Sequence, residues 1–339
     1  LKRQNLNMPL DIRYRIKKML DFTLYYIKPN GKAPIIGDED NGRLLPFLEY
    51  EIVDHRYLLS LGAIEFNNSL YKKYSRGYVS DTFFLLGIDG KDNFNKINTV
   101  NYTLQSKAFA DAGFCILRHD DFYMFINNSG TAKYSDIKLI GGSHAHADML
   151  SFELAIDKIS FIVDPGSYVY TSSAKDRNLF RSTAMHNTIT IDKKDQHTLP
   201  NDDLFMTKEI GKPVVFEYDF KSEFDKFIGS HNGYQKLKNG VIHKREILFS
   251  KKNKKFEIID YLTGSGEHDI NWNFHFGEKI EVKLFDGYIE ARSMIDNKSI
   301  KMQFETKLNI TLNVLDSFIS TSYGTKSTAK SVSIIATSK

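Results

Sequence analysis

The sequence predicts a mainly β protein, in which an antiparallel β-sandwich follows a shorter helical segment. Two patterns carry this prediction. Apolar residues recur at helical spacing before residue 95, whereas short apolar runs bounded by turn residues dominate after about residue 104. The composition agrees, because the 339 residues include 25 Phe and 18 Tyr, and aromatic side chains are enriched in strands.

The helical segment is assigned to residues 1–95 and the sandwich to residues 96–339. The first helix starts at Pro9, where proline suits a first turn, and stops at Pro29-Asn30-Gly31. Further helices are expected at 44–61 and 81–86, and the polar stretch 88–100 is expected to be a linker.

Strands are expected wherever an apolar run ends in Gly, Asn, Asp or Lys, and such spacing is typical of an antiparallel sandwich. The runs are 114–117, 122–126, 152–156, 159–163, 188–191, 214–218, 246–249, 256–259, 279–284, 308–314 and 331–336.

Composition excludes several classes of protein. The net charge of +4 is too mild to predict nucleic-acid binding, although it suits an anionic small molecule or polysaccharide. Cys115 is the single cysteine, so neither an internal disulfide nor a cysteine zinc site is expected, and its apolar surroundings predict a buried strand residue. No stretch is long and apolar enough to predict a membrane span. Because Leu1 is not an initiator methionine and no signal peptide is visible, we expect a fragment or a trimmed chain.

The stretch 141–148, Gly-Gly-Ser-His-Ala-His-Ala-Asp, is the most informative in the chain. If it forms a strand, His144, His146 and Asp148 share one face, because strand side chains alternate. Two further polar clusters follow at 163–168 and 181–188. Two histidines and a carboxylate from separate segments are a common way to hold a divalent metal, and a remaining histidine is free for proton transfer.

Four motifs share one order with a known family. They are Gly37-Asp38-x-Asp40-x-Gly42-Arg43, His144-x-His146-x-Asp148-x-Leu150, Val163-Asp164-Pro165-Gly166-Ser167-Tyr168-x-Tyr170, and Arg177-Asn178-x-Phe180-Arg181-Ser182-Thr183-x-x-His186-Asn187-Thr188. Together they resemble the heparinase II/III-like family of polysaccharide lyases over roughly residues 10–200. Beyond residue 200 the pattern is that of a generic sandwich.

The resemblance implies the last helices of an α/α toroid followed by a large β-sandwich of the supersandwich type. It implies cleavage of uronate-containing polysaccharides by β-elimination. It also implies a divalent metal, most often zinc, held by His146, Asp164 and His186, and it leaves His144 for the substrate as a catalytic residue.

The residue types suit this chemistry on their own account. β-Elimination removes a proton beside a carboxylate, so the enzyme must neutralise the carboxylate, supply a base and protonate the leaving oxygen. Arg177 and Arg181 are expected to grip uronate or sulfate groups. Tyr168, and with it Tyr170, is a candidate for stacking on sugar rings.

Each role has a plainer alternative. His146, Asp164 and His186 could form a buried polar network without metal, and His144 could be a hydrogen-bonded histidine lining a cleft. Asp164 and Asn187 could be turn residues, the two arginines could form structural salt bridges, and the tyrosines could simply pack. Asp148 is expected to hold His146 through the second imidazole nitrogen, whereas the segment containing Asp38, Asp40 and Arg43 is best explained as a structural loop.

The sequence departs from the family at one point. A catalytic tyrosine is expected upstream of the Gly-Asp-x-Asp segment, and Tyr14, Tyr25 and Tyr26 lack its motif. The chain is therefore expected to carry one half of the catalytic site. A non-catalytic polysaccharide-binding or capsule-assembly protein of the same fold remains an alternative, as does a cupin that uses Glu153 as a metal ligand. The substrate class favours a periplasmic or secreted location in a bacterium.

Overall fold

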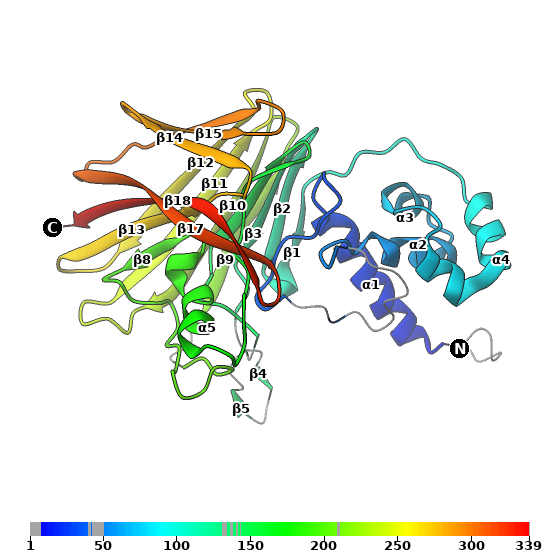
Figure 1. Ribbon diagram of the computed structural model, residues 1–339, viewed down its shortest axis with the longest axis horizontal. Helices are drawn as coiled ribbons and strands as arrows, with labels where there is room; N and C mark the ends of the chain where they lie inside the picture. Colours follow the sequence, from blue (N-terminus) through cyan, green and yellow to red (C-terminus); the bar gives the residue numbers. More distant parts are fainter. Residues whose placement is uncertain are drawn as a thin grey trace. The chain divides into compact units, whose positions relative to one another are not determined.

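The chain consists of two compact units. This computed structural model describes residues 8–39, 42, 51–130, 134–135, 138–139, 142, 144–208 and 211–338. One unit combines Leu1–Ala33 with Gly42–Leu104, and the other combines Pro34–Asn41 with Gln105–Lys339 (Figure 1). Residues 34–41, which the sequence-based division places with the helices, therefore belong to the strand-rich unit.

The first unit is helical. Its helices are α1 (Leu10–Tyr26), α2 (Arg56–Phe66), α3 (Ser69–Tyr74) and α4 (Ser80–Lys96). In α1, Leu20 and Leu24 lie one helical turn apart and are both buried. That these helices end a larger α/α toroid stays a prediction.

Two helix predictions are wrong in their bounds. Of the predicted helix 44–61, residues 44–50 lie outside the described part, and α2 begins only at Arg56. Asp54 precedes it and its carboxylate accepts hydrogen bonds from the Arg56 backbone and side chain. The predicted linker 88–100 is mostly α4, which passes a kink at Gly87 (φ 65°, ψ −160°) and continues to Lys96.

The second unit is built from antiparallel sheets. The first sheet contains, in spatial order, β1 (Lys107–Phe109), β2 (Phe114–His119), β3 (Phe122–Asn127), β6 (Ser151–Ile156) and β7 (Ile159–Ile162). The second sheet contains β12 (Lys255–Thr263), β11 (Val241–Ser250), β10 (Phe224–Tyr234) and β9 (Pro213–Phe220). The third contains β17 (Ile310–Ser322), β18 (Thr325–Ser338), β13 (His268–His275) and β8 (Ile189–Ile191).

Two smaller sheets complete this unit. One contains β14 (Ile280–Phe285), β15 (Tyr288–Ser293) and β16 (Ser299–Gln303), and the other pairs β4 (Tyr134–Ser135) with β5 (Lys138–Leu139). Helix α5 (Ala174–Phe180) and a 3-10 turn (Thr183–Met185) lie between β7 and β8. The predicted mainly β fold is confirmed.

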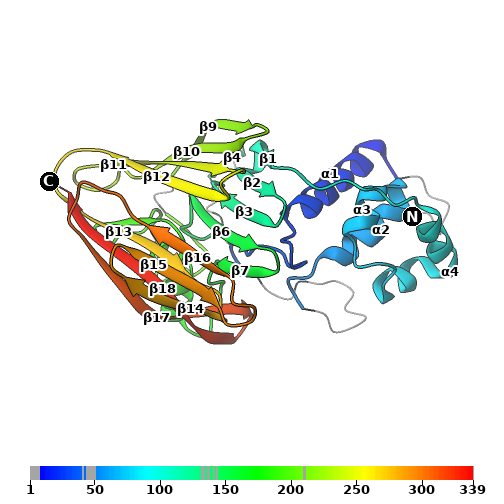
Figure 2. The same ribbon diagram turned by 90° about the horizontal axis from the view of Figure 1, so that it is seen from above.

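One hydrophobic core joins the first three sheets and the small sheet of β14 to β16. Figure 2 shows β9 to β12 on one side of the sandwich and β13, β17 and β18 on the other. The fully or nearly buried side chains between them include Phe152, Phe227, Phe249, Phe274 and Ile289. Burial of each such side chain stabilises the fold by roughly 1.5–3 kcal/mol, so the sheets form a firm support for the loops at their ends.

The condition that 144–148 forms a strand is not met. Residues 144–150 form turns and irregular backbone, and β6 begins only at Ser151. Leu150 adopts a positive φ of 62° although it is not glycine, a conformation that surrounding structure must hold in place. The chain therefore bends sharply just after the His-x-His pair and before it enters the core.

Within the described residues, the structure contains no helix with the length and apolar character that a membrane span needs.

Candidate functional site

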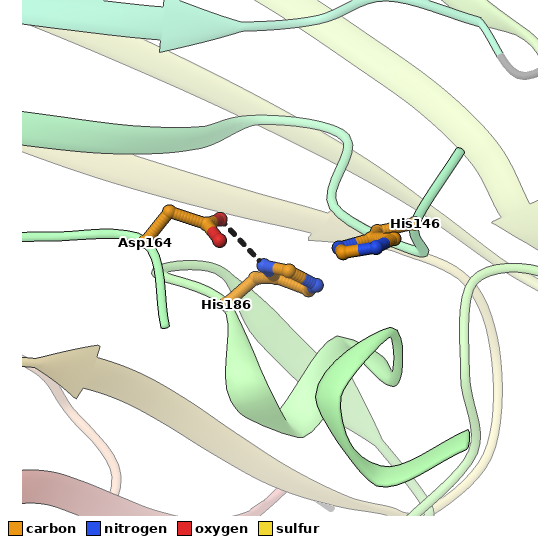
Figure 3. A group of neighbouring side chains, drawn as sticks. All are labelled: His146, Asp164 and His186. Carbon is orange, nitrogen blue, oxygen red and sulfur yellow. Dashed lines mark hydrogen bonds and ion pairs between the residues drawn. The ribbon is translucent and has the colours of Figure 1, made fainter. Parts of the chain in front are cut away.

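Three polar side chains from separate segments meet in the sandwich unit. His146 lies in the turns before β6, Asp164 follows β7, and His186 follows the 3-10 turn Thr183–Met185. One ligand atom from each lies within 4.8 Å of the others, and Figure 3 shows the two imidazole rings facing each other with Asp164 beside His186. All three residues are buried, with exposures of 1%, 6% and 0% in chain order. The structure thus brings together the three residues predicted to hold a metal.

The hydrogen bonds of this cluster leave one nitrogen on each histidine without a partner. His186 Nδ1 donates to Asp164 Oδ2 at 2.7 Å, and His146 Nε2 donates to Asp38 Oδ1 at 3.0 Å. The other ring nitrogens, His146 Nδ1 and His186 Nε2, are buried and accept no hydrogen bond from any described residue. A buried polar atom without a partner costs about 1–3 kcal/mol. Two unpartnered imidazole nitrogens beside a carboxylate are donors that fit a divalent cation, zinc above all.

Opposite charges shift the pKa values of the buried pair. Burial lowers the pKa of His186, but the charge of Asp164 and its hydrogen bond outweigh burial, so the net pKa is raised. Burial raises the pKa of Asp164, yet the charge and hydrogen bond of His186 lower it overall. The carboxylate is therefore ionised and available as an anionic ligand.

Asp38 connects this cluster to a third histidine, His144. Its Oδ2 lies 2.9 Å from His144 Nδ1, while Oδ1 accepts from His146. Arg177 donates to both carboxylate oxygens, with Nη2 at 2.7 Å from Oδ2. Burial opposes ionisation of Asp38, but the hydrogen bonds from His146 and Arg177 lower its pKa to about 2.

These contacts sharpen one sequence-based interpretation and correct another. Asp38 lies in a loop, as expected, but its side chain is only 1% exposed and contacts both members of the His-x-His pair. Asp148 is not the acceptor for His146: its Oδ2 accepts from Asn127 Nδ2 at 2.8 Å. Asp40 and Arg43 lie outside the described residues.

His144 differs from His146 in its exposure. The side chain of His144 is 65% exposed, whereas that of His146 is fully buried. Because Nδ1 of His144 faces the Asp38 carboxylate, Nε2 is the nitrogen left for an exchangeable proton. The arrangement can therefore offer one histidine to a ligand in solvent while the other stays in the buried cluster.

Asn187, next to His186, ties the motif segments together. Its side-chain amide donates to the carbonyl oxygens of Phe152 (2.8 Å) and Val163 (2.9 Å). Its Oδ1 accepts from the backbone N–H of His275 at 2.7 Å. A single buried amide thus links β6, the segment that carries Asp164, and β13.

Arg245 supports the same segments from β11. Its guanidinium is fully buried and forms a bidentate ion pair with Asp260 at 2.7 and 2.9 Å. Its Nη1 donates to the carbonyl oxygens of Leu150 (2.7 Å) and Asn187 (2.9 Å). Two charge-assisted hydrogen bonds therefore fix the bend at Leu150 and the position of the residue after His186.

Comparison with known proteins places these features in one family. The family model described as "Heparinase II/III-like, C-terminal" matches residues 102–339. The chain belongs to the heparinase II/III-like family. The matched range contains His144, the three clustered residues and Arg245, whereas Asp38 precedes it.

Two curated relatives carry the name heparin-sulfate lyase. The protein from Bacteroides stercoris is 26% identical over 211 residues, which cover 60% of this chain and 27% of the relative. The protein from Pedobacter heparinus is 28% identical over 177 residues, which cover 49% of this chain and 23% of the relative. The chain therefore matches about a quarter of the length of these heparinase II/III-like relatives.

Solved structures share the fold. A mutant of the heparan sulfate lyase HepC from Pedobacter heparinus superposes with a TM-score of 0.74 at 21% identity, covering 100% of this chain and 47% of that chain. A structure titled heparinase III superposes with a TM-score of 0.70 at 19% identity, covering 97% and 48%. The chain thus spans about half of each solved heparinase. The cupin interpretation is wrong, and Glu153 lies apart from the cluster, accepting from the backbone N–H of Ile35 at 2.7 Å.

The three residues predicted to contact substrate, Arg177, Arg181 and Tyr168, differ in burial and in their partners. Arg177 and Arg181 are both fully buried, and Arg177 is already paired with Asp38. Arg181 Nε donates to Asn178 Oδ1 at 2.8 Å, but its terminal nitrogens contact no acceptor among the described residues, and burial followed by the charge of Arg177 lowers its pKa to about 10. Tyr168 is half-buried and packs against Phe180 at 5.4 Å between ring centroids.

Sequence reasoning missed the role of Asp38 and did not single out Arg245. A signal existed for Asp38, because it lies in the Gly-Asp-x-Asp segment that was among the motifs resembling the family. Arg245 gave none, since an arginine in an amphipathic strand is usually a solvated surface residue.

Proposed function

We propose that this protein is a polysaccharide lyase that cleaves a uronate-containing anionic polysaccharide by β-elimination. Membership of the heparinase II/III-like family and relatives named heparin-sulfate lyase support the proposal. The observation that carries it is the division of the His-x-His pair. His146 is buried with an unpartnered Nδ1, whereas His144 is exposed and oriented by Asp38.

In this proposal His144 takes part in proton transfer at the substrate. The reaction removes a proton from the carbon beside the uronate carboxylate, forms a carbon–carbon double bond and expels the glycosidic oxygen, which takes up a proton. With Nδ1 bound to Asp38, Nε2 of His144 can accept or donate that proton, or stabilise the developing negative charge as a cation. The second proton-transfer group would be the tyrosine that the family resemblance places upstream of the Gly-Asp-x-Asp segment.

The cluster of His146, Asp164 and His186 would hold a divalent metal, for which Zn²⁺ is the best fit by donor type. The ion would supply positive charge to a buried site that contains more than one carboxylate. Asp38 would fix the ring of His146 through Nε2. The chain's own residues thereby keep the ligand nitrogens in place and exclude water from them.

The substrate proposal extends to the predicted contacts. Arg177 and Arg181 would add buried positive charge that attracts the anionic substrate, and Tyr168 would pack beside the bound sugar. A substrate of this class lies outside the cytoplasm, so the proposal includes a periplasmic or secreted location.

Absorbance spectroscopy tests the lyase proposal. β-Elimination leaves an unsaturated uronate at the new chain end, and this conjugated product absorbs in the ultraviolet. We expect absorbance to rise when the full-length protein is incubated with heparan sulfate, heparosan or another uronate polymer, and to stay flat with His144→Ala. No rise with any uronate polymer would overturn the lyase proposal.

A non-catalytic polysaccharide-binding protein is the second candidate. It keeps the same fold and the same buried cluster, because a fold does not by itself require activity. Such a protein would bind a uronate polymer equally before and after His144→Ala and would show no turnover in either form.

A further inference from the structure

Aromatic rings from three separate segments gather beside the exposed His144. Tyr170 follows β7, Phe205 lies between β8 and β9, and Tyr323 lies in the turn between β17 and β18. The centroid of the His144 ring lies 6.3 Å from that of Tyr170 and 5.8 Å from that of Phe205. Tyr170 is in turn 5.6 Å from Phe205 and 5.0 Å from Tyr323. The four rings form one continuous group.

The buried guanidinium of Arg177 packs against two rings of this group, those of Tyr170 and Phe205. The guanidinium carbon of Arg177 lies 5.2 Å from the ring centre of Tyr170 and 5.3 Å from that of Phe205. Arg177 is fixed by Asp38, which also contacts His144. The aromatic rings and the exposed histidine are therefore oriented by the same carboxylate, so the group is preorganised rather than an accidental contact of surface residues.

The turn that carries Tyr323 is fastened to the segment after Asp164. Ser320 N donates to Pro165 O, and Gly324 N donates to Tyr168 O, both at 2.7 Å. Gly166 allows the strand to approach this closely, because a Cβ there would lie 2.0 Å from Ser320 O. Tyr323, which is 44% exposed, is thus held at the edge of the group by backbone hydrogen bonds.

Lys326, at the start of β18, adds positive charge after this turn. Lys326 Nζ lies 4.6 Å from the ring centre of Tyr168 and 4.8 Å from that of Phe318. Lys326 is exposed, and no acidic side chain of the described residues lies within ion-pair distance of it. Its ammonium group is available to an anionic ligand.

We propose that Tyr170, Phe205, Tyr323 and Lys326 form a saccharide-binding subsite next to His144. The apolar C–H face of a pyranose ring would pack on the tyrosine and phenylalanine rings, and Lys326 would meet a carboxylate or sulfate of the same or the neighbouring sugar. The ligand class rests on the proposed function, but the subsite requires no cleavage. The subsite also replaces Tyr168 as the expected stacking residue, because Tyr168 packs beneath Lys326 and against Phe180.

Binding measurements with matched variants test the subsite. The test variants are Tyr323→Ala and Lys326→Gln. Their controls are Tyr261→Ala and Lys244→Gln, because Tyr261 is 43% exposed and Lys244 Nζ lies 4.9 Å from its ring centre on the separate sheet of β11 and β12. All four changes are made in His144→Ala protein to prevent cleavage, and affinity is measured for heparan sulfate and for heparosan, which carries uronate without sulfate.

We expect Tyr323→Ala to weaken binding to both polymers by about fivefold, the effect of about 1 kcal/mol of lost ring packing. A loss with Lys326→Gln on both polymers assigns the lysine to the carboxylate, whereas a loss on heparan sulfate alone assigns it to sulfate. The proposal is overturned if the test variants bind like their controls, or if His144→Ala protein binds neither polymer. Subsite-dependent binding by a wild-type protein that forms no unsaturated product would contradict the lyase proposal and leave the subsite standing.

Discussion

His146 Nε2 and Asp38 Oδ1 lie 3.0 Å apart, although the two residues are separated by 108 positions in the chain. This hydrogen bond occupies Nε2 of the His146 ring. The other ring nitrogen, Nδ1, is buried and unpartnered in the cluster with His186 and Asp164. Asp38 orients His144 at the same time. One carboxylate thus orients two histidines that are two positions apart in the sequence, and it gives each of them a different environment.

The first prediction concerns the charge of Asp38. Asp38→Asn removes the anion that faces the fully buried Arg177, and an uncompensated buried charge costs about 3–5 kcal/mol in the free energy of unfolding. Denaturant unfolding measures this loss. The double variant Asp38→Asn with Arg177→Met should recover part of it, because the unpaired cation is then gone. Simple additivity of the two single losses would show that the pair is not coupled.

The second prediction compares two ion pairs of similar length and opposite exposure. Arg245 and Asp260 approach to 2.7 Å with side chains 1% and 6% exposed, whereas Lys330 and Asp316 approach to 2.6 Å with side chains 45% and 93% exposed. Arg245→Met should lower the free energy of unfolding by about 3–5 kcal/mol, because it leaves the buried Asp260 carboxylate without its ion-pair partner. Lys330→Met should cost less than about 1 kcal/mol. Equal losses in urea unfolding would contradict the supporting role of Arg245.

The third prediction concerns acid stability. His197 is fully buried, and burial followed by the charge of Lys236 lowers its pKa from 6.5 to about 3. The unfolded chain therefore takes up this proton before the folded one does. The stability that neutral His197 contributes is complete above pH 6.5 and is lost as the pH falls toward 3.

A substitution isolates this contribution. His197→Asn keeps an acceptor for the Gly211 backbone N–H, which Nδ1 now accepts at 3.0 Å, and removes the titrating group. The slope of unfolding free energy against pH between about 3 and 6.5 should then flatten by up to about 1.4 kcal/mol per pH unit. Identical slopes for the variant and the parent would refute the assignment.

The sequence predicted those parts of the fold that local pattern determines. Each predicted apolar run coincides with or overlaps a strand, because short apolar runs bounded by turn residues are visible in the sequence. The strands β10 and β13 were missed because buried polar residues interrupt their apolar positions: Ser230 and His231 in β10, and Asn273 and His275 in β13. Apolar runs cannot report a strand whose buried positions are partly hydrogen-bonded polar groups.

The candidate site divides in the same way. The grouping of His146, Asp164 and His186 was predicted from motifs of distinctive spacing, and the structure brings them together. The residues that orient these three side chains were not predicted. Asp38 and its partner Arg177 are 139 positions apart in the chain, and Arg245 and its partner Leu150 are 95 positions apart. Such contacts depend on how sheets stack and leave no local pattern in the chain.

The metal content of two single variants tests the central claim most directly. The division of the His-x-His pair predicts that purified His144→Ala protein retains about one zinc per chain, as the parent does, whereas His146→Ala protein retains almost none. Elemental analysis of the three folded proteins gives these ratios. Loss of metal from His144→Ala, or equal metal in His146→Ala and the parent, would contradict the account.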